Sequence, residues 1–71
     1  MAIIVDARGL SCPQPVLMTI GEIKKGSDDI EVLVDTETSK ENVSRAATSH
    51  KCDVTDVTEE DNFFRIHIKR N

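Results

Sequence analysis

The order of apolar patterns along this chain restricts its fold more than any other feature of the sequence. Short β-branched runs alternate with segments in which apolar residues recur at helical spacing. The predicted strands cover residues 2–6, 30–35, 52–57 and 63–68, and the predicted helices cover residues 13–25 and 38–50. A strand-helix-strand order favours parallel pairing through a crossover helix, and the last two runs predict a hairpin. The fold class is therefore α/β (α+β).

Two right-handed crossovers among neighbouring strands place both helices on one face of the sheet. The sequence thus predicts a βαβαββ two-layer sandwich with a four-stranded mixed sheet, and strand alternation assigns side chains to its faces. The side chains that point toward the helices are Ile3, Val5, Ile30, Val32, Val34, Phe64, Ile66 and Ile68. Ile4, Leu33 and Phe63 point away, either as ordinary surface residues or as a contact for a dimer or another partner.

Capping signals mark the ends of both predicted helices. The apolar face of the first helix consists of Val16, Leu17, Ile20 and Ile23. Gly26 is its expected C-cap, and Thr38 with Glu41 forms a capping box at the start of the second helix.

Composition narrows the classes of function. The 71 residues suffice for one small domain, residues 1–71, and no apolar run approaches the length that spans a bilayer. With no recognisable leader and no CxxC pair, a cytoplasmic protein with reduced thiols and no membrane contact is expected. The formal net charge of −4 and the two aromatic residues disfavour a nucleic-acid partner. Protein or small-molecule partners are favoured.

The stretch DARGLSCPQPVLMTI, residues 6–20, places Cys12 between a glycine turn and two prolines. If Pro13 takes the first helical position, Cys12 becomes the N-cap, and Pro15 still lies in the first turn, where its missing N–H removes no helical hydrogen bond. Unpaired N–H groups and the helix dipole then favour the thiolate, and Arg8 is a candidate for a nearby positive charge. The pattern favours a reactive Cys12 over a buried structural cysteine.

At these residues the sequence resembles the TusA/SirA-like family of sulfur carrier proteins, including its YedF-like branch. The family pattern D-x-x-G-x-x-C-P-x-P stands here as Asp6, Gly9, Cys12, Pro13 and Pro15. The resemblance extends over essentially the whole chain and implies a two-layer α/β sandwich. It also implies that the cysteine accepts sulfane sulfur as a persulfide from a donor such as a cysteine desulfurase and passes it to an acceptor protein. By resemblance Cys12 is the catalytic residue.

The sequence departs from the family at the end of the second predicted helix, where members more usually have glycine and this chain has Lys51. Either Lys51 adopts the left-handed conformation that glycine favours, at a cost of about 1 kcal/mol, or the helix ends in another way.

The rest of the motif is expected to support Cys12 without a metal or organic cofactor, in a monomer or weak dimer. The supporting residues are Asp6, Arg8, Gly9, Pro13 and Pro15. Cys52 opens an alternating strand, so it is interpreted as a core residue rather than a resolving thiol. His50 and His67 are interpreted as surface residues rather than zinc ligands.

Two other classes of function stay open. The same element order resembles the C-terminal domain of a bacterial translation initiation factor, so an RNA-binding module is one alternative. A regulatory interaction module with a structural Cys12 is the other. Salt-dependent binding of RNA distinguishes the first alternative, and rapid alkylation of Cys12 near neutral pH argues against the second. The sequence does not identify the sulfur donor, the acceptor or the pathway.

Overall fold

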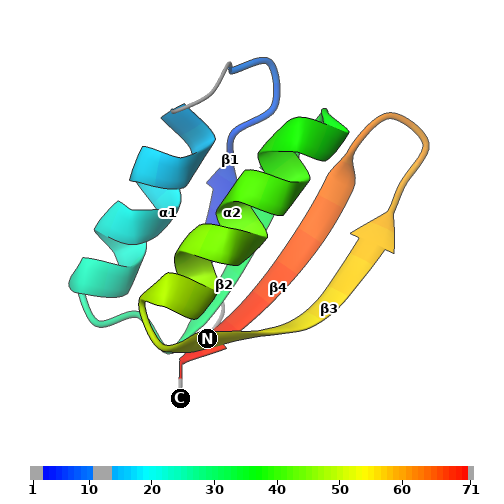
Figure 1. The fold of residues 1–71 in the computed structure, drawn as a ribbon. Helices are drawn as coiled ribbons and strands as arrows, with labels where there is room; N and C mark the ends of the chain where they lie inside the picture. Colours follow the sequence, from blue (N-terminus) through cyan, green and yellow to red (C-terminus); the bar gives the residue numbers. More distant parts are fainter. Residues whose placement is uncertain (1–2, 11–13, 71) are drawn as a thin grey trace.

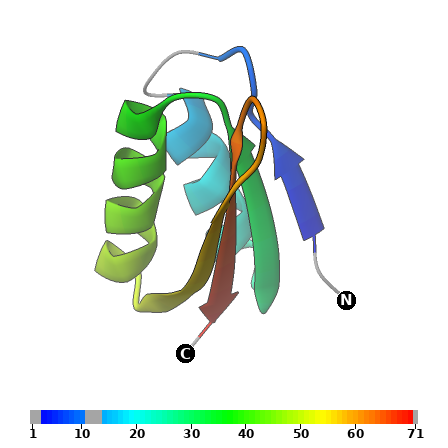
Figure 2. The ribbon, with the colours of Figure 1, turned by 90° about the vertical axis from the view of Figure 1, so that its right-hand side faces the viewer.

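A mixed four-stranded sheet with both helices on one face makes up the protein (Figure 1). The structure is a computed structural model that describes residues 3–10 and 14–70. Along the chain the elements are β1 (Ile3–Asp6), α1 (Gln14–Lys24), β2 (Asp29–Val34), α2 (Glu37–Ser49), β3 (Cys52–Glu59) and β4 (Phe64–Arg70). The strand order is β1-β2-β4-β3, in which β1 is parallel to β2 and β4 is antiparallel to both of its neighbours. Figure 2 shows α1 and α2 on the same side of the sheet, which confirms the predicted βαβαββ sandwich.

The core lies between the sheet and the two helices. Val5 pairs with Val32 and Val32 pairs with Ile66, and all three side chains are buried. Ile23, Val43 and Ala47 are the buried helix residues of the same core cluster. Cys52 belongs to this cluster too, with 3% of its surface exposed and its thiol 3.7 Å from the carbonyl oxygen of His50. The interpretation of Cys52 as a core residue is confirmed.

The assignment of side chains to faces holds for most strand residues, and its exceptions have local causes. Ile3 is 40% exposed because β1 is an edge strand. Phe64 is half-buried, with the Lys40 ammonium of α2 4.9 Å from its ring centroid. Leu33 lies on the face away from the helices, here called the open face, yet only 8% of it is exposed. Its register partners there are Asp6 and Arg65, whose side chains flank it.

The buried face of α1 differs from the predicted one. Leu17 is 56% exposed, and the buried residues are Pro15, Thr19 and Ile23, which are spaced four residues apart. The hydroxyl of Thr19 donates to the carbonyl oxygen of Pro15 at 2.8 Å. With this hydrogen bond a threonine is buried at little cost, because its polar group is satisfied within its own helix.

The predicted capping box of Thr38 and Glu41 is wrong. The helix begins two residues earlier, and Thr36 is its N-cap, accepting a hydrogen bond from the Ser39 N–H at 3.1 Å. Both threonines are good capping residues. Because β2 ends at Val34, the helix starts early enough for Thr36, rather than Thr38, to take the N-cap position.

Lys51 adopts the left-handed conformation that the sequence indicated as one of two possibilities. Its φ is 64°, directly after His50, which caps the C-terminus of α2. The Lys51 N–H donates to the carbonyl oxygen of Thr48 at 3.1 Å, so the strained residue closes the end of the helix. A side chain at this φ brings Cβ close to the following carbonyl oxygen.

We therefore expect Lys51→Gly to stabilise the protein by about 1 kcal/mol, because glycine adopts this conformation without the steric penalty. Urea unfolding monitored by circular dichroism measures the difference. Lys24→Gly, at the last residue of α1, is the matched control and should destabilise, because glycine lowers helix propensity. A Lys51→Gly protein no more stable than the original chain would contradict this account.

Candidate functional site

The turn that follows β1 lies beside the end of β2, because parallel strands bring their carboxyl ends to one edge of the sheet. The Ala7 N–H donates to the carbonyl oxygen of Leu33 at 2.9 Å and extends the pairing past β1. The Leu10 N–H then donates to the carbonyl oxygen of Ala7 at 3.3 Å and closes a turn. Gly9, inside this turn, has a φ of +79°, which glycine adopts readily.

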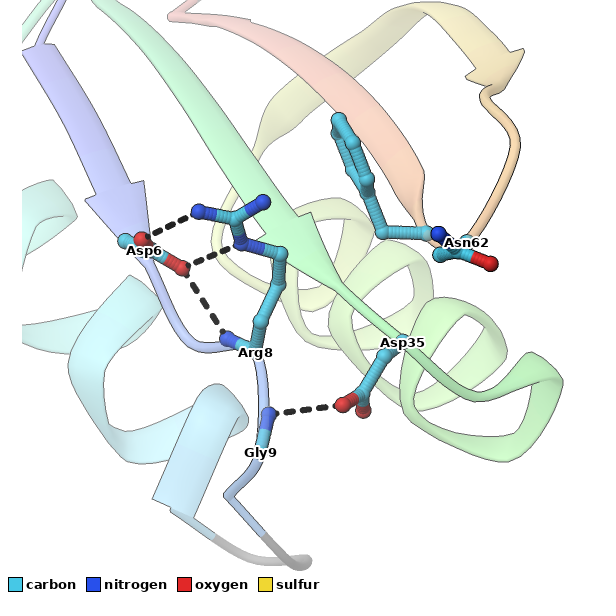
Figure 3. Close-up of a pocket in the computed structure, with 6 residues that line it drawn as sticks. Asp6, Arg8, Gly9, Asp35 and Asn62 are labelled. Atoms are coloured by element: carbon cyan, nitrogen blue, oxygen red, sulfur yellow. Dashed lines mark hydrogen bonds and ion pairs between the residues drawn. The ribbon is translucent and has the colours of Figure 1, made fainter.

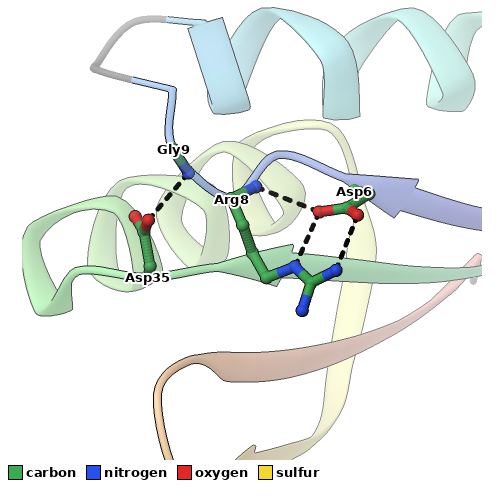
Figure 4. A network of polar contacts seen from close by, with 4 residues as sticks. All are labelled: Asp6, Arg8, Gly9 and Asp35. Atoms are coloured by element: carbon green, nitrogen blue, oxygen red, sulfur yellow. Dashed lines mark hydrogen bonds and ion pairs between the residues drawn. The ribbon is translucent and has the colours of Figure 1, made fainter.

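Arg8 is bound to Asp6 through both its side chain and its backbone. The Nε and Nη2 groups each donate to a different carboxylate oxygen at 2.9 Å, and the Arg8 N–H donates to Oδ1 at 3.2 Å (Figure 4). Hydrogen bonds from the Arg8 side chain and backbone lower the pKa of Asp6 from 3.8 to about 2. The hydrogen bond to Asp6 likewise raises the pKa of Arg8, and the negative charge of Asp35 acts in the same direction. Through these hydrogen bonds, Arg8 holds the turn against Asp6.

Two contacts from distant parts of the chain reach the same turn. The Gly9 N–H donates to Oδ2 of Asp35 at 2.7 Å, across 26 residues of sequence. The guanidinium carbon of Arg8 lies 4.9 Å from the ring centroid of Phe63, which precedes β4. Figure 3 shows the Arg8 guanidinium beside the Asp6 carboxylate, with Asp35 directed at Gly9. A shallow depression of about 570 Å³ is lined by Asp6, Arg8, Gly9, Asp35, Asn62 and Phe63.

Comparison with known proteins assigns the chain to a family. A sequence profile described as Sulfurtransferase TusA matches residues 3–70. The chain belongs to the TusA sulfurtransferase family. The crystal structure of a SirA-like protein from Desulfitobacterium hafniense is similar, with 26% sequence identity, a TM-score of 0.85, and coverage of 97% of this chain and 96% of that chain. Among the curated proteins, none matches this sequence significantly.

The resemblance to TusA/SirA-like proteins is thereby confirmed. Of the motif residues, Asp6 ends β1 and is hydrogen-bonded to Arg8, and Gly9 is hydrogen-bonded to Asp35. Pro15 is buried near the start of α1. Cys12 and Pro13 lie outside the described residues.

Sequence reasoning missed Asp35 and the contact between Phe63 and Arg8. A signal for Asp35 was present, because it is the last residue of the predicted strand 30–35 and precedes a predicted helix. The ends of parallel neighbouring strands meet at one edge, so a polar residue there is a candidate neighbour of the turn after β1. For Phe63 only the face of the sheet could be predicted, because its contact with Arg8 depends on the turn between β3 and β4.

The described residues offer no metal site and no membrane-spanning helix. In residues 3–10 and 14–70, no three His, Cys, Asp or Glu side chains gather in a way that holds a metal ion. His67 lies on the open face and contacts Asp29 through Nε2, and His50 is exposed at the end of α2. Neither helix in this part of the chain is long and apolar enough to cross a membrane.

The Asp6–Arg8 pair predicts how Asp6 titrates. We expect NMR titration to give a carboxyl pKa of about 2 for Asp6. In Arg8→Ala the pKa of Asp6 should return toward 3.8, because the hydrogen bonds to the carboxylate are lost. A lowered pKa means that the pair stabilises the folded state above pH 3.8 and that this contribution disappears as the pH falls toward 2.

Lys25→Ala, which removes an exposed cation paired with Glu22 on α1, is the control and should leave Asp6 unchanged. An Asp6 carboxyl that titrates alike in the original chain and in Arg8→Ala would show that the pair does not persist in solution.

Proposed function

We propose that this protein carries sulfane sulfur as a persulfide on Cys12 and transfers it between partner proteins. The observation that carries the proposal is the match to the sulfurtransferase family over residues 3–70, together with a single CPxP motif at residues 12–15. Two contacts near the start of the motif support it: Arg8 is hydrogen-bonded to Asp6, and Gly9 is hydrogen-bonded to Asp35. Cys12 lies three positions after Gly9 in the sequence.

Each transfer exchanges one sulfur–sulfur bond for another. The Cys12 thiolate attacks the terminal sulfur of a persulfide on the donor, such as a cysteine desulfurase. A bond forms between Sγ of Cys12 and that sulfur, and the donor's sulfur–sulfur bond breaks, leaving its electron pair on the donor cysteine as a thiolate. An acceptor thiolate then attacks the terminal sulfur on Cys12, and Cys12 leaves as a thiolate. Neither step needs an external oxidant, a metal or an organic cofactor.

The remaining motif residues have supporting roles in this proposal. Arg8 and Gly9 hold the turn through Asp6 and Asp35, so the chain enters the motif from a fixed point. Pro13 and Pro15 restrict φ around the cysteine and remove no required helical hydrogen bond. Transfer between proteins also requires a donor and an acceptor that contact this part of the molecule, and the carrier acts as a monomer or weak dimer.

The test is sulfur loading followed by mass spectrometry of the intact protein. After incubation with a cysteine desulfurase and cysteine, we expect one added sulfur atom that maps to Cys12 and is released by a thiol reductant. Cys12→Ser should take up none, because serine provides no thiolate. Cys52→Ser is the matched control and should load like the original chain, because Cys52 is buried in the core.

Sulfur that maps to Cys52, or no uptake while an established carrier loads in the same assay, would contradict the proposal. The family match favours the carrier over the RNA-binding and regulatory alternatives. RNA binding that weakens steeply with salt, in a protein that takes up no sulfur, would support the RNA-binding module instead.

A further inference from the structure

The carboxylate of Asp35 connects the end of β2 to the turn that leads to the CPxP motif. We propose that Asp35 is a positioning residue for Cys12, which acts by holding the Gly9 backbone N–H. This inference deepens the proposed function and rests on it for its biological meaning. Nothing in the CPxP pattern itself points to Asp35, because it lies 26 residues from Gly9 in the sequence.

The bond between Gly9 and Asp35 satisfies a donor that the turn leaves free. The Leu10 N–H closes the turn on the carbonyl oxygen of Ala7, whereas the Gly9 N–H points out of the turn to Oδ2 of Asp35 at 2.7 Å (Figure 4). A hydrogen bond to a carboxylate at this distance is charge-assisted and stronger than one between neutral groups. It therefore selects one orientation of the Gly9 peptide among those that glycine can adopt.

Asp35 is itself held on both sides. It follows Val34, which is fully buried at the end of β2, and precedes Thr36, the N-cap of α2. The positive end of the α2 dipole favours a carboxylate at this point. Asp35 is thus held in position by β2 and α2, and its carboxylate restrains the turn.

The restraint matters because only Leu10 and Ser11 separate Gly9 from Cys12 in the sequence. On the other side of Cys12 in the sequence, α1 begins at Gln14. Because so few residues separate Gly9 from Cys12, we expect the orientation of the Gly9 peptide to influence the thiol, and loss of the Asp35 contact to remove that influence. We expect a less well-defined Cys12 thiol that reacts more slowly.

The test compares Asp35→Ala with Asp35→Asn, because these changes separate positioning from charge. Both remove the negative charge, but the asparagine side-chain oxygen still accepts from the Gly9 N–H. Alkylation of Cys12 by iodoacetamide, followed by mass spectrometry at a fixed pH, reports on the thiol without any sulfur donor. The NMR signal of the Gly9 amide and its hydrogen exchange report on the bond directly.

We expect Asp35→Ala to slow Cys12 alkylation by about threefold to tenfold, the equivalent of one lost hydrogen bond. The Gly9 amide proton should then exchange faster with solvent. Asp35→Asn should keep the original rate or exceed it and should keep the Gly9 amide protected. Asp53→Ala, which removes a carboxylate from the exposed edge strand β3, is the matched control for net charge and should change neither measurement.

Three outcomes would overturn the proposal. Faster alkylation in both Asp35 variants would show that Asp35 acts on Cys12 through its charge alone. Unchanged alkylation in both, with equally lowered thermal stability, would show that Asp35 serves only the start of α2. If Asp35→Ala does not fold, Asp35→Glu displaces the carboxylate by one methylene, and an unchanged rate and Gly9 amide signal in that variant would exclude positioning. If the Asp35 variants are alkylated at the expected rates but the original chain takes up no sulfur, the result would contradict the proposed function while supporting the role of Asp35.

Discussion

The parallel pairing of β1 with β2 is the constraint on which the rest of the structure depends. Parallel neighbours cannot be joined by a tight turn, so the chain must cross over, and α1 makes this crossover on the face where Val5, Val32 and Ile66 are buried. The same pairing brings the carboxyl ends of β1 and β2 to one edge of the sheet. The turn after β1 and the carboxylate after β2 therefore meet there, and the family motif begins at that meeting point.

The sheet and its layers were predictable because the central strands β2 and β4 bury alternate apolar side chains on one side. Alternation in β2 and β4 separates Val32, Val34, Ile66 and Ile68 from the residues of the open face, and register then follows from matching the buried sets. The helices were harder. A threonine counts as polar in a periodic pattern, but Thr19 is fully buried because its hydroxyl reaches the Pro15 carbonyl, a contact that apolar spacing does not reveal. The N-cap of α2 was predicted at the wrong residue for a similar reason. Thr36 and Thr38 both suit the position, and the structure around the end of β2 decides that Thr36 caps the helix.

Only those residues of the candidate site that are neighbours in the sequence could be predicted. Asp6, Arg8 and Gly9 are neighbours in the sequence, and a motif can identify them together. Asp35 and Phe63 join them through the strand order β1-β2-β4-β3, in which β4 lies next to β2 although β3 precedes it in the chain. Local sequence does not determine which strand lies beside which. The contacts of Asp35 and Phe63 with the turn therefore depend on the arrangement of β1, β2 and β4.

The open face completes the support of this turn, through packing more than through charge. Arg8 pairs with Asp6 and Arg65 with Glu31, and the guanidinium groups of both arginines lie within 6.0 Å of the Phe63 ring centroid. Exposed ion pairs of this kind contribute little to stability individually. Arginine stems and an aromatic ring can cover apolar surface. Leu33, whose register partners are Asp6 and Arg65, is 8% exposed although neither helix lies on the open face. The carbonyl oxygen of Leu33 also accepts the Ala7 N–H, so this residue pairs with the backbone at the start of the turn. Arg8 therefore contacts the open face in two ways, as the partner of Asp6 and through the ring of Phe63.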